Sequence, residues 1–190
     1  MRDPIETERL VLRPFTADDV DHLVTLNSDP DVMRFLTNGN PTAREKIEQE
    51  ILPTWLSYQE QYDHLGYWAL QERESSAFLG WIAIEPRNAS GEADGTQAEL
   101  EYRLVKRAWG NGFATEGSVA LIAAAFAEPS VTRVWARTMA VNSLGRSVLE
   151  RSGLSFVRTV HEKLDDPIDG TEQGEVEYEL TRETWENARR

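Results

Sequence analysis

The sequence contains no cysteine in its 190 residues. This absence excludes disulfides, a thiol nucleophile and any metal site built on thiolates. Long apolar runs are also missing, because no stretch approaches the roughly 20 hydrophobic residues that span a bilayer. The first six residues contain no apolar core of a signal peptide. We therefore expect a soluble, cytoplasmic protein that makes no contact with a membrane.

Basic residues are also in short supply. Lys and Arg number 20 against 33 Asp and Glu, so the formal net charge is −13. Because binding to a phosphate backbone requires a basic stripe, we expect no nucleic-acid partner. A negative field attracts amines, although acidic residues also serve solubility alone. Residues 162–179 hold eight acids against Lys163, and this stretch is a candidate for recruiting a basic peptide or polycation.

The hydrophobic pattern changes period along the chain. Alternation typical of strands is found in residues 8–13, 67–71, 78–84, 99–104, 134–141, 154–160 and 176–181. Helical spacing is found in residues 16–26, 42–62 (with an interruption at Pro53), 114–127 and 143–152. The order predicts a single α/β (α+β) domain over residues 1–190. Its sheet of about seven strands is expected to be mostly antiparallel, with one βαβ crossover.

A glycine turn separates the strand 99–104 from the helix 114–127. Gly110 and Gly112 have no Cβ, so the backbone can curl and a ligand can approach it closely. Consecutive N–H groups of this turn then point into one concavity at the positive end of the following helix. This arrangement predicts a phosphate site, although an ordinary strand-to-helix connection explains a G-x-G pair equally well.

Histidines and aromatic residues are the other side chains that could form a site. His22, His64 and His161 show no metal-ligand spacing, so we expect no metal. Trp55, Tyr58, Trp68 and Trp81 are candidates for lining a pocket, and packing in the core is the favoured interpretation of each.

Several blocks of the sequence resemble one known family. Arg107-x-x-Gly110-x-Gly112 is similar to the R/Q-x-x-G-x-G/A signature of the GNAT acetyltransferases. The string 109–116 resembles the W-G-x-G-[YF]-A-T-E form of its ribosomal-protein N-terminal acetyltransferase (RimJ/RimL-like) branch. Residues 7–14, 28–35, 78–82 and 142–153 resemble further blocks of that branch, so the likeness covers nearly the whole chain.

The resemblance implies a GNAT fold and acetyl-CoA as the co-substrate. It places the pantetheine arm on the backbone of Leu104 and Val105, and Asn142 near the thioester. It implies a pyrophosphate cradle formed by Gly110, Asn111, Gly112, Phe113, Ala114 and Thr115. Arg107 and Arg146 are candidates for contacts with the adenosine-side phosphates. Members of the branch often dimerise, so a homodimer is one expected assembly.

The implied reaction is direct attack of a primary amine on the acetyl thioester, which requires a base. Glu99 is the leading candidate because it matches the strand carboxylate of the family, and Glu101 shares its face of the strand. A general acid or hydrogen-bond donor should also meet the leaving thiolate, and here the sequence departs from the family pattern. Gly145 and Leu149 occupy the positions where relatives carry Ser or Tyr. Ser147 is a neighbouring hydroxyl that is a candidate for this role.

The acceptor is left open between a basic protein N-terminus and a small-molecule amine. Two other functions remain as alternatives. The first is a non-catalytic acyl-CoA-binding or regulatory domain that has lost turnover, which Gly145 and Leu149 favour because they replace the family's hydroxyl residues. A Rossmann oxidoreductase is the second, but its motif requires glycine where Thr115 stands.

Overall fold

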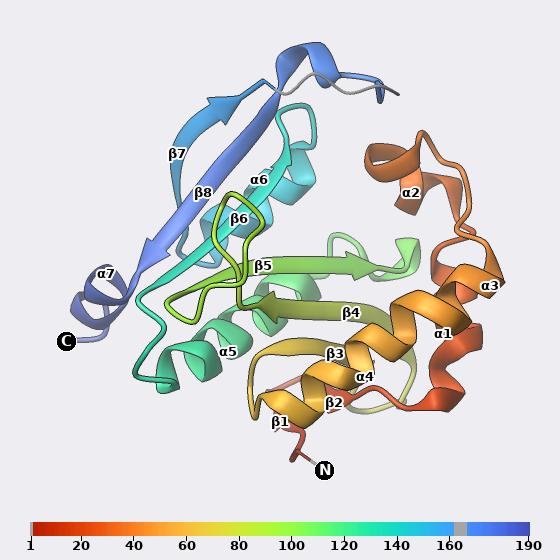
Figure 1. Ribbon diagram of the computed structural model, residues 1–190, viewed down its shortest axis with the longest axis horizontal. Helices are drawn as coiled ribbons and strands as arrows, with labels where there is room; N and C mark the ends of the chain where they lie inside the picture. Colours follow the sequence, from red (N-terminus) through yellow and green to blue (C-terminus); the bar gives the residue numbers. More distant parts are fainter. Residues whose placement is uncertain (1, 162–166) are drawn as a thin grey trace.

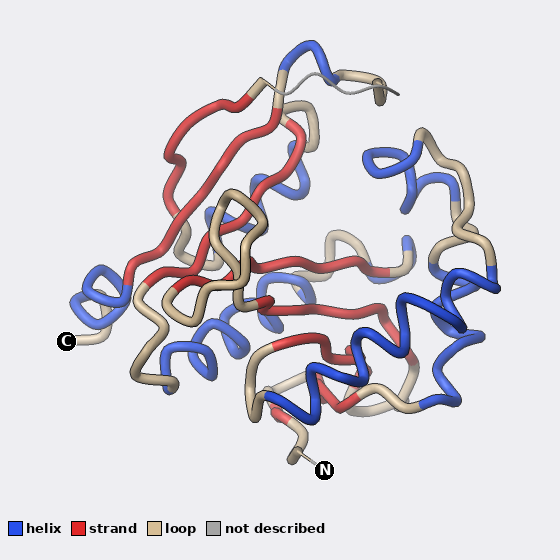
Figure 2. Tube along the Cα trace, viewed as in Figure 1, coloured by secondary structure: helices blue, strands red, loops and turns tan. Residues whose placement is uncertain are grey.

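The computed structural model describes residues 2–161 and 167–190, and its centre is an eight-stranded sheet (Figures 1 and 2). The strand order is β1-β2-β3-β4-β5-β6-β8-β7, and β5 and β6 are the parallel neighbours in an otherwise antiparallel sheet. The strands are β1 (Ile5–Glu6), β2 (Leu10–Pro14), β3 (Gly66–Glu72), β4 (Phe78–Glu85), β5 (Gln97–Leu104), β6 (Arg133–Met139), β7 (Ser155–Val160) and β8 (Glu175–Thr181). The predicted mixed sheet with one βαβ crossover is confirmed.

Helices cover both faces of the sheet. They are α1 (Val20–Leu26), α2 (Pro30–Thr37), α3 (Arg44–Lys46), α4 (Leu52–Gln61), α5 (Phe113–Ala127), α6 (Ser143–Arg151) and α7 (Arg182–Asn187). Short 3-10 turns lie at Ala17–Asp19, Lys106–Ala108 and Thr171–Gln173. One core lies between α5 and the sheet and includes Trp68, Ile82 and Leu121. A second core, which includes Leu23, Trp55 and Trp81, lies under α1 and α4 on the opposite face. Each face of the central strands is therefore shielded from water.

Four details differ from the sequence expectations. The strand β1 is an eighth strand, and two residues are too few to show an alternating pattern. The helical segment 42–62 continues through Pro53, which follows a π-helical turn at Ile47–Ile51 and lies in the first turn of α4, where its missing N–H is tolerated. The helices α2 and α7 were not assigned from periodicity, because eight and six residues offer little more than two turns.

The parallel pairing of β5 with β6 is short. It joins Gln97–Glu99 to Arg133–Trp135, after which β5 continues along β4 and β6 continues along β8. The two strands therefore diverge toward their carboxyl ends, as Figure 1 shows. This divergence opens the sheet and exposes backbone groups of β5 that no neighbouring strand pairs.

Candidate active site

A cavity of about 610 Å³ lies where β5 and β6 diverge. Its walls come from α2, the end of β5, the glycine turn, the end of β6 and α6, together with Trp81 of β4 and Glu175 of β8. Asn38, at the end of α2, donates a hydrogen bond to the Pro167 carbonyl (3.2 Å) and accepts one from the Asp169 N–H (3.1 Å). These bonds connect α2, which lines the cavity, to the segment that precedes β8.

The glycine turn has the geometry expected of an anion site. Gly110 and Gly112 have φ angles of 74° and 78°, which favour glycine, and Gly112 is the N-cap of α5. The Asn111 side chain closes the turn by donating to the Trp109 carbonyl (3.0 Å). Within residues 2–161 and 167–190, no hydrogen bond uses the N–H groups of residues 110–115. These donors lie at the positive end of a 15-residue helix and suit a phosphate.

Glu116 anchors this turn to the beginning of β2. Its carboxylate accepts hydrogen bonds from the Thr7 hydroxyl (2.6 Å), the Arg9 N–H (2.9 Å) and the Arg9 guanidinium (2.7 Å). Although burial opposes it, this set of donors lowers the pKa of Glu116 below its usual value. Arg9 also donates to the Asn111 carbonyl (2.9 Å), which holds the turn in place.

The predicted cofactor contacts do not all face the cavity. Leu104, Asn142 and the turn residues Gly110, Gly112, Phe113, Ala114 and Thr115 line it. The Val105 N–H instead donates to the Leu79 carbonyl (2.9 Å), and the Leu104 carbonyl accepts from the Trp109 indole (2.8 Å). Because hydrogen-bonded pairs alternate along antiparallel strands, the backbone groups of Tyr102 turn away from β4 toward the opening.

The two arginines proposed for phosphate contacts are held by other partners. The Arg107 guanidinium donates to the Phe78 carbonyl (2.8 Å). Arg146 donates to the Tyr178 hydroxyl (3.2 Å) and to the Ala140 carbonyl (3.4 Å). Neither side chain lines the cavity, so their role toward phosphates stays a prediction.

Gly145 is required by its surroundings. A Cβ there would lie 2.6 Å from the Asn142 side-chain nitrogen and 3.0 Å from the Thr138 hydroxyl. The Asn142 side chain caps α6 by accepting from the Gly145 N–H (3.0 Å), and it donates to Thr138 (3.0 Å). Leu149 belongs to the buried core. At the two positions where the resemblance implies a hydroxyl, packing therefore excludes a side chain at Gly145 and buries Leu149 in the core.

Several residues with hydroxyl groups line the cavity near Gly145. Ser147 is one of them, as the sequence suggested. Tyr102 is another, and its hydroxyl donates to the Gly145 carbonyl (2.9 Å), which connects β5 to α6 across the opening. Burial raises the pKa of Tyr102 well above its usual value.

Carboxylates gather around Arg87 on the face of β4 and β5 that also carries Trp81. Arg87 contacts Glu99, Glu101 (2.9 Å) and Glu85 (3.8 Å), and Glu85 accepts from the hydroxyls of Tyr58 and Tyr67. Burial, together with the Glu101 charge, raises the pKa of Glu99 to about 7 against the opposing effect of Arg87. Burial also raises the pKa of Glu101, and Glu101 is the member of the pair that lines the cavity.

Sequence reasoning did not single out Arg87, Tyr102 or Arg103. Alternation along β5 was a signal for Arg103, because it places this residue on the face of Glu99 and Glu101. Arg103 lines the cavity together with Trp81, whereas Trp68 is fully buried in the core. Arg87 lies beyond the end of β4, where no periodicity indicates the direction of a side chain.

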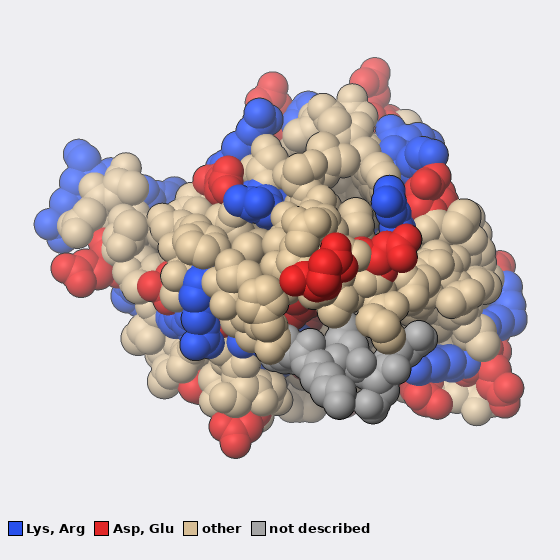
Figure 3. All heavy atoms as spheres, turned by 90° about the horizontal axis from the view of Figure 1, so that it is seen from above, with Lys and Arg blue, Asp and Glu red and all other residues tan. Residues whose placement is uncertain are grey.

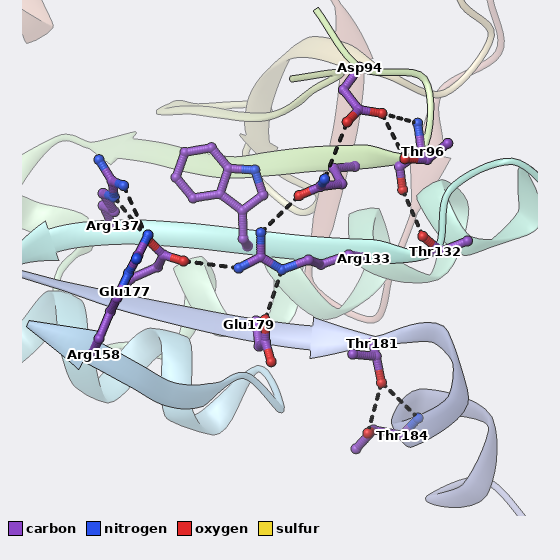
Figure 4. Close-up of polar contacts among 12 residues, drawn as sticks. Asp94, Thr96, Thr132, Arg133, Arg137, Arg158, Glu177, Glu179, Thr181 and Thr184 are labelled. Carbon is purple, nitrogen blue, oxygen red and sulfur yellow. Dashed lines mark hydrogen bonds and ion pairs between the residues drawn. The ribbon is translucent and has the colours of Figure 1, made fainter. Parts of the chain in front are cut away.

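Part of the acidic stretch 162–179 forms hydrogen bonds with arginines of the sheet. Residues 162–166 lie outside the described residues. Glu177 accepts hydrogen bonds from Arg133 (2.9 Å), Arg137 (3.1 Å) and Arg158 (3.1 Å), as Figure 4 shows, and Glu179 accepts one from Arg133 (2.8 Å). Seen from above, acidic and basic side chains are interspersed and form no continuous patch of one sign (Figure 3). These two carboxylates of β8 are therefore paired internally.

In the part of the chain that the structure describes, no group of three or more His, Asp or Glu side chains is arranged to hold a metal ion. No helix within the same residues has the length and apolar character needed to cross a bilayer.

Comparisons with known proteins agree with this geometry. The family model for the acetyltransferase (GNAT) domain matches residues 9–155. FsC-acetyl coenzyme A-N(2)-transacetylase of Aspergillus fumigatus is 32% identical over 188 residues, which cover 95% of this chain and 77% of the relative.

Two solved structures share the fold. The spermidine N-acetyltransferase of Vibrio cholerae, in complex with CoA and spermine, has a TM-score of 0.74 and 14% identity, and covers 95% of this chain and 100% of its own. Aminoglycoside acetyltransferase AAC(6')-Ib, in complex with coenzyme A, has a TM-score of 0.72 and 18% identity, and covers 95% and 99%. Because the family model covers most of the sequence, the chain belongs to the GNAT acetyltransferase family and is an acyl-CoA-dependent N-acetyltransferase that uses acetyl-CoA.

Proposed function

We propose that this enzyme transfers the acetyl group of acetyl-CoA directly to a primary amine of a small molecule. The observation that carries the proposal is the carboxylate pair Glu99 and Glu101, which lies beside the cavity with raised pKa values. A raised pKa brings a carboxylate closer to neutrality, where a general base is most effective. The pair therefore supports a general base beside the cavity.

The cofactor side of the cavity suits the CoA pyrophosphate. The N–H groups of residues 110–115, which have no hydrogen-bond partner among the described residues, lie at the start of α5, and such donors bind phosphate oxygens. The unpaired backbone of Tyr102 and the N–H of Leu104 offer hydrogen bonds to an amide-containing arm. When bound, acetyl-CoA supplies the acetyl group, and the chain supplies orientation and proton transfer.

Glu101 is the group that receives the proton of the attacking amine. It lines the cavity, whereas Glu99 is 8% exposed and lies behind it. Arg87 contacts both carboxylates, so it limits the cost of holding two acids close together. Because the two acids interact, their protons are lost in steps that belong to the pair.

The hydroxyl of Ser147 acts as the hydrogen-bond donor to the leaving sulfur, because the Tyr102 hydroxyl already donates to the Gly145 carbonyl. A thiol has a pKa of about 8.5, and burial places the pKa of Tyr102 above its ordinary value. A thiolate therefore leaves without needing a proton from Tyr102. This explains how the chain tolerates Gly145 and Leu149 at the positions of the family's hydroxyls.

The choice of a small-molecule acceptor rests on the Aspergillus relative. Its name specifies acetyl transfer to an N(2) nitrogen of FsC, and the two chains align over 188 residues. A protein N-terminus, which the resemblance to the ribosomal-protein branch implies, is the second candidate. Both acceptors are neutral amines when they react, so both require the same base.

Purified enzyme, acetyl-CoA and a panel of amines test this function. The panel contains amino acid derivatives, diamines, aminoglycosides and short peptides with free N-termini. We expect CoA release to match formation of an N-acetyl product, measured by thiol titration and mass spectrometry. Calorimetric binding of acetyl-CoA with no product from any amine would instead establish a non-catalytic acyl-CoA-binding domain.

The turn is tested by Gly112→Ala. A residue with a Cβ at a φ of 78° costs about 1–2 kcal/mol, so the turn relaxes and its N–H groups no longer converge. We expect the Kd for acetyl-CoA, measured by calorimetry, to rise about tenfold. Gly91→Ala is the matched control, because Gly91 has a φ of 82° with no atom near its Cβ position. Equal effects of the two substitutions on Kd would refute this role.

The role of Arg87 is tested by Arg87→Met. Arg87 opposes the rise in the pKa values of Glu99 and Glu101, so its removal raises both values further. The base is then protonated over a wider range, and we expect the acid limb of the kcat/KM profile to move up by about one pH unit. Rates from pH 5.5 to 9 with the best amine of the panel measure this shift. If the acid limb does not move, the pH dependence of kcat/KM does not come from these carboxylates.

A further inference from the structure

Two hydrogen-bond donors on the cavity wall have no role in the proton transfer proposed above. Trp81 on β4 and Arg103 on β5 are register partners, and the Arg103 guanidinium carbon lies 5.3 Å from the centroid of the Trp81 ring. Both side chains line the cavity. Trp81 is 3% exposed, and in the described part of the chain nothing accepts a hydrogen bond from its indole nitrogen. A buried donor without a partner costs about 1–3 kcal/mol, so a ligand that accepts from it gains that amount.

The Arg103 guanidinium has more N–H groups than its hydrogen bond in the described residues uses. Its Nη1 donates to the Asn27 side-chain oxygen (2.6 Å), which holds the guanidinium in place from the end of α1. Within the described residues Arg103 forms no ion pair, although a guanidinium carries five N–H groups. Burial lowers the pKa of Arg103 to about 10, so the side chain stays cationic at neutral pH. Arg103 therefore presents N–H donors, and no acceptor, to the cavity, and the Trp81 ring, whose buried indole N–H has no partner in the described residues, lies beside its guanidinium.

The position of these donors relative to the base limits what they bind. Glu101 and Arg103 are two positions apart on one face of β5, a separation of about 7 Å. That distance accommodates a hydrogen bond at each end and one short connecting unit between an amine and an oxygen. A longer connection would carry the oxygen past Arg103.

We propose that Trp81 and Arg103 bind an oxygen on the carbon adjacent to the one that bears the reacting amine. The acceptor class is then an α-amino acid or α-amino acyl compound, with its amine at Glu101 and its carbonyl or carboxylate oxygen at Trp81 and Arg103. This inference rests on the proposed function, and it adds the chemical group next to the amine. A plain alkylamine lacks the oxygen and leaves both donors unpaired.

Three acceptors of matched shape test the inference. Phenylalanine amide carries a neutral carbonyl, phenylalanine carries a carboxylate, and phenethylamine lacks both groups. We expect the wild-type kcat/KM for the better of the first two to exceed that for phenethylamine by at least about tenfold. The order of the first two acceptors distinguishes a carbonyl from a carboxylate as the preferred group.

Trp81→Phe and Arg103→Lys identify the donors. Trp81→Phe keeps an aromatic ring but removes the N–H, and Arg103→Lys keeps the charge but removes the planar fork. We expect each variant to reduce the ratio of the two kcat/KM values about five- to tenfold. Trp185→Phe and Arg189→Lys, both in the C-terminal segment away from the cavity, are the controls and should keep the wild-type ratio.

A ratio measured on one preparation does not depend on how much of it is folded. A wild-type ratio near one, or ratios unchanged in both variants, would overturn the inference while leaving amine acetylation intact. If wild-type enzyme acetylates no amine in the panel, it is the proposed function that fails.

Discussion

Replacement of Glu101 by Gln is expected to lower kcat about 10²- to 10³-fold, with a smaller effect on the KM for acetyl-CoA. General base catalysis contributes 10²–10⁴-fold in enzymes, and Gln keeps the size of the side chain while it removes the proton acceptor. Glu101 lines the cavity, and its neighbour Glu99 is the nearest substitute base. We therefore expect Glu101→Gln to retain a small residual rate and the double variant with Glu99→Gln to lose it.

The pH dependence of kcat/KM is an independent test of this prediction. Burial raises the pKa of Glu99 to about 7 and raises that of Glu101 in the same direction. A base is active only when deprotonated, so wild-type kcat/KM should fall on acidification at a pH above the ordinary range of a carboxylate. Glu101→Gln should alter this limb, whereas Glu74→Gln, in an exposed turn, should leave rate and profile unchanged. A wild-type rate in Glu101→Gln would exclude Glu101 as the base.

Replacement of Glu177 by Ala is expected to lower the free energy of unfolding by about 3 kcal/mol. Glu177 is 2% exposed and accepts hydrogen bonds from Arg133, Arg137 and Arg158 on the neighbouring strands (Figure 4). Without the carboxylate, Arg133 and Arg137, whose side chains are 21% and 17% exposed, both lose a buried anionic partner. Urea unfolding followed by circular dichroism measures the change.

Glu179→Ala is the matched control for this experiment. Glu179 lies on the same strand but is 37% exposed and pairs with Arg133 alone among the described ion pairs. Exposed ion pairs contribute about 0–1 kcal/mol, so this variant should remain close to wild type. Equal losses in the two variants would show that the three-arginine contact carries no special stability.

The same group predicts how stability depends on pH. Although burial opposes it, the hydrogen bonds from the three arginines lower the pKa of Glu177 in the folded state. Its contribution is therefore present above the unfolded pKa of about 4.3 and is lost as the pH falls through the folded value. The difference in stability between wild type and Glu177→Ala should shrink in acid, and a constant difference down to pH 3 would contradict the assignment.

Periodicity and local chemistry determined much of the fold. Alternation in 99–104 and helical spacing in 114–127 correspond to β5 and α5, and the glycines between them adopt the positive φ angles that the turn demands. These features depend on neighbours within a few residues along the chain. The elements missed, such as β1 and α7, are too short to show a period.

The sequence by itself determined the glycine turn before α5 and the face of β5 that carries Glu99, Glu101 and Arg103. What lies opposite that face was decided by tertiary structure alone. Arg87 reaches Glu99 and Glu101 from beyond the end of β4, and Trp81 is the partner of Arg103 through strand register. The turn proposed as a phosphate site is likewise held by Arg9, a hundred residues away in sequence. A repeating pattern indicates which way a side chain points. The partners that set the pKa of that side chain, or that use its hydrogen-bond donors, come from distant segments of the sequence. Only the packed sheet brings those segments together.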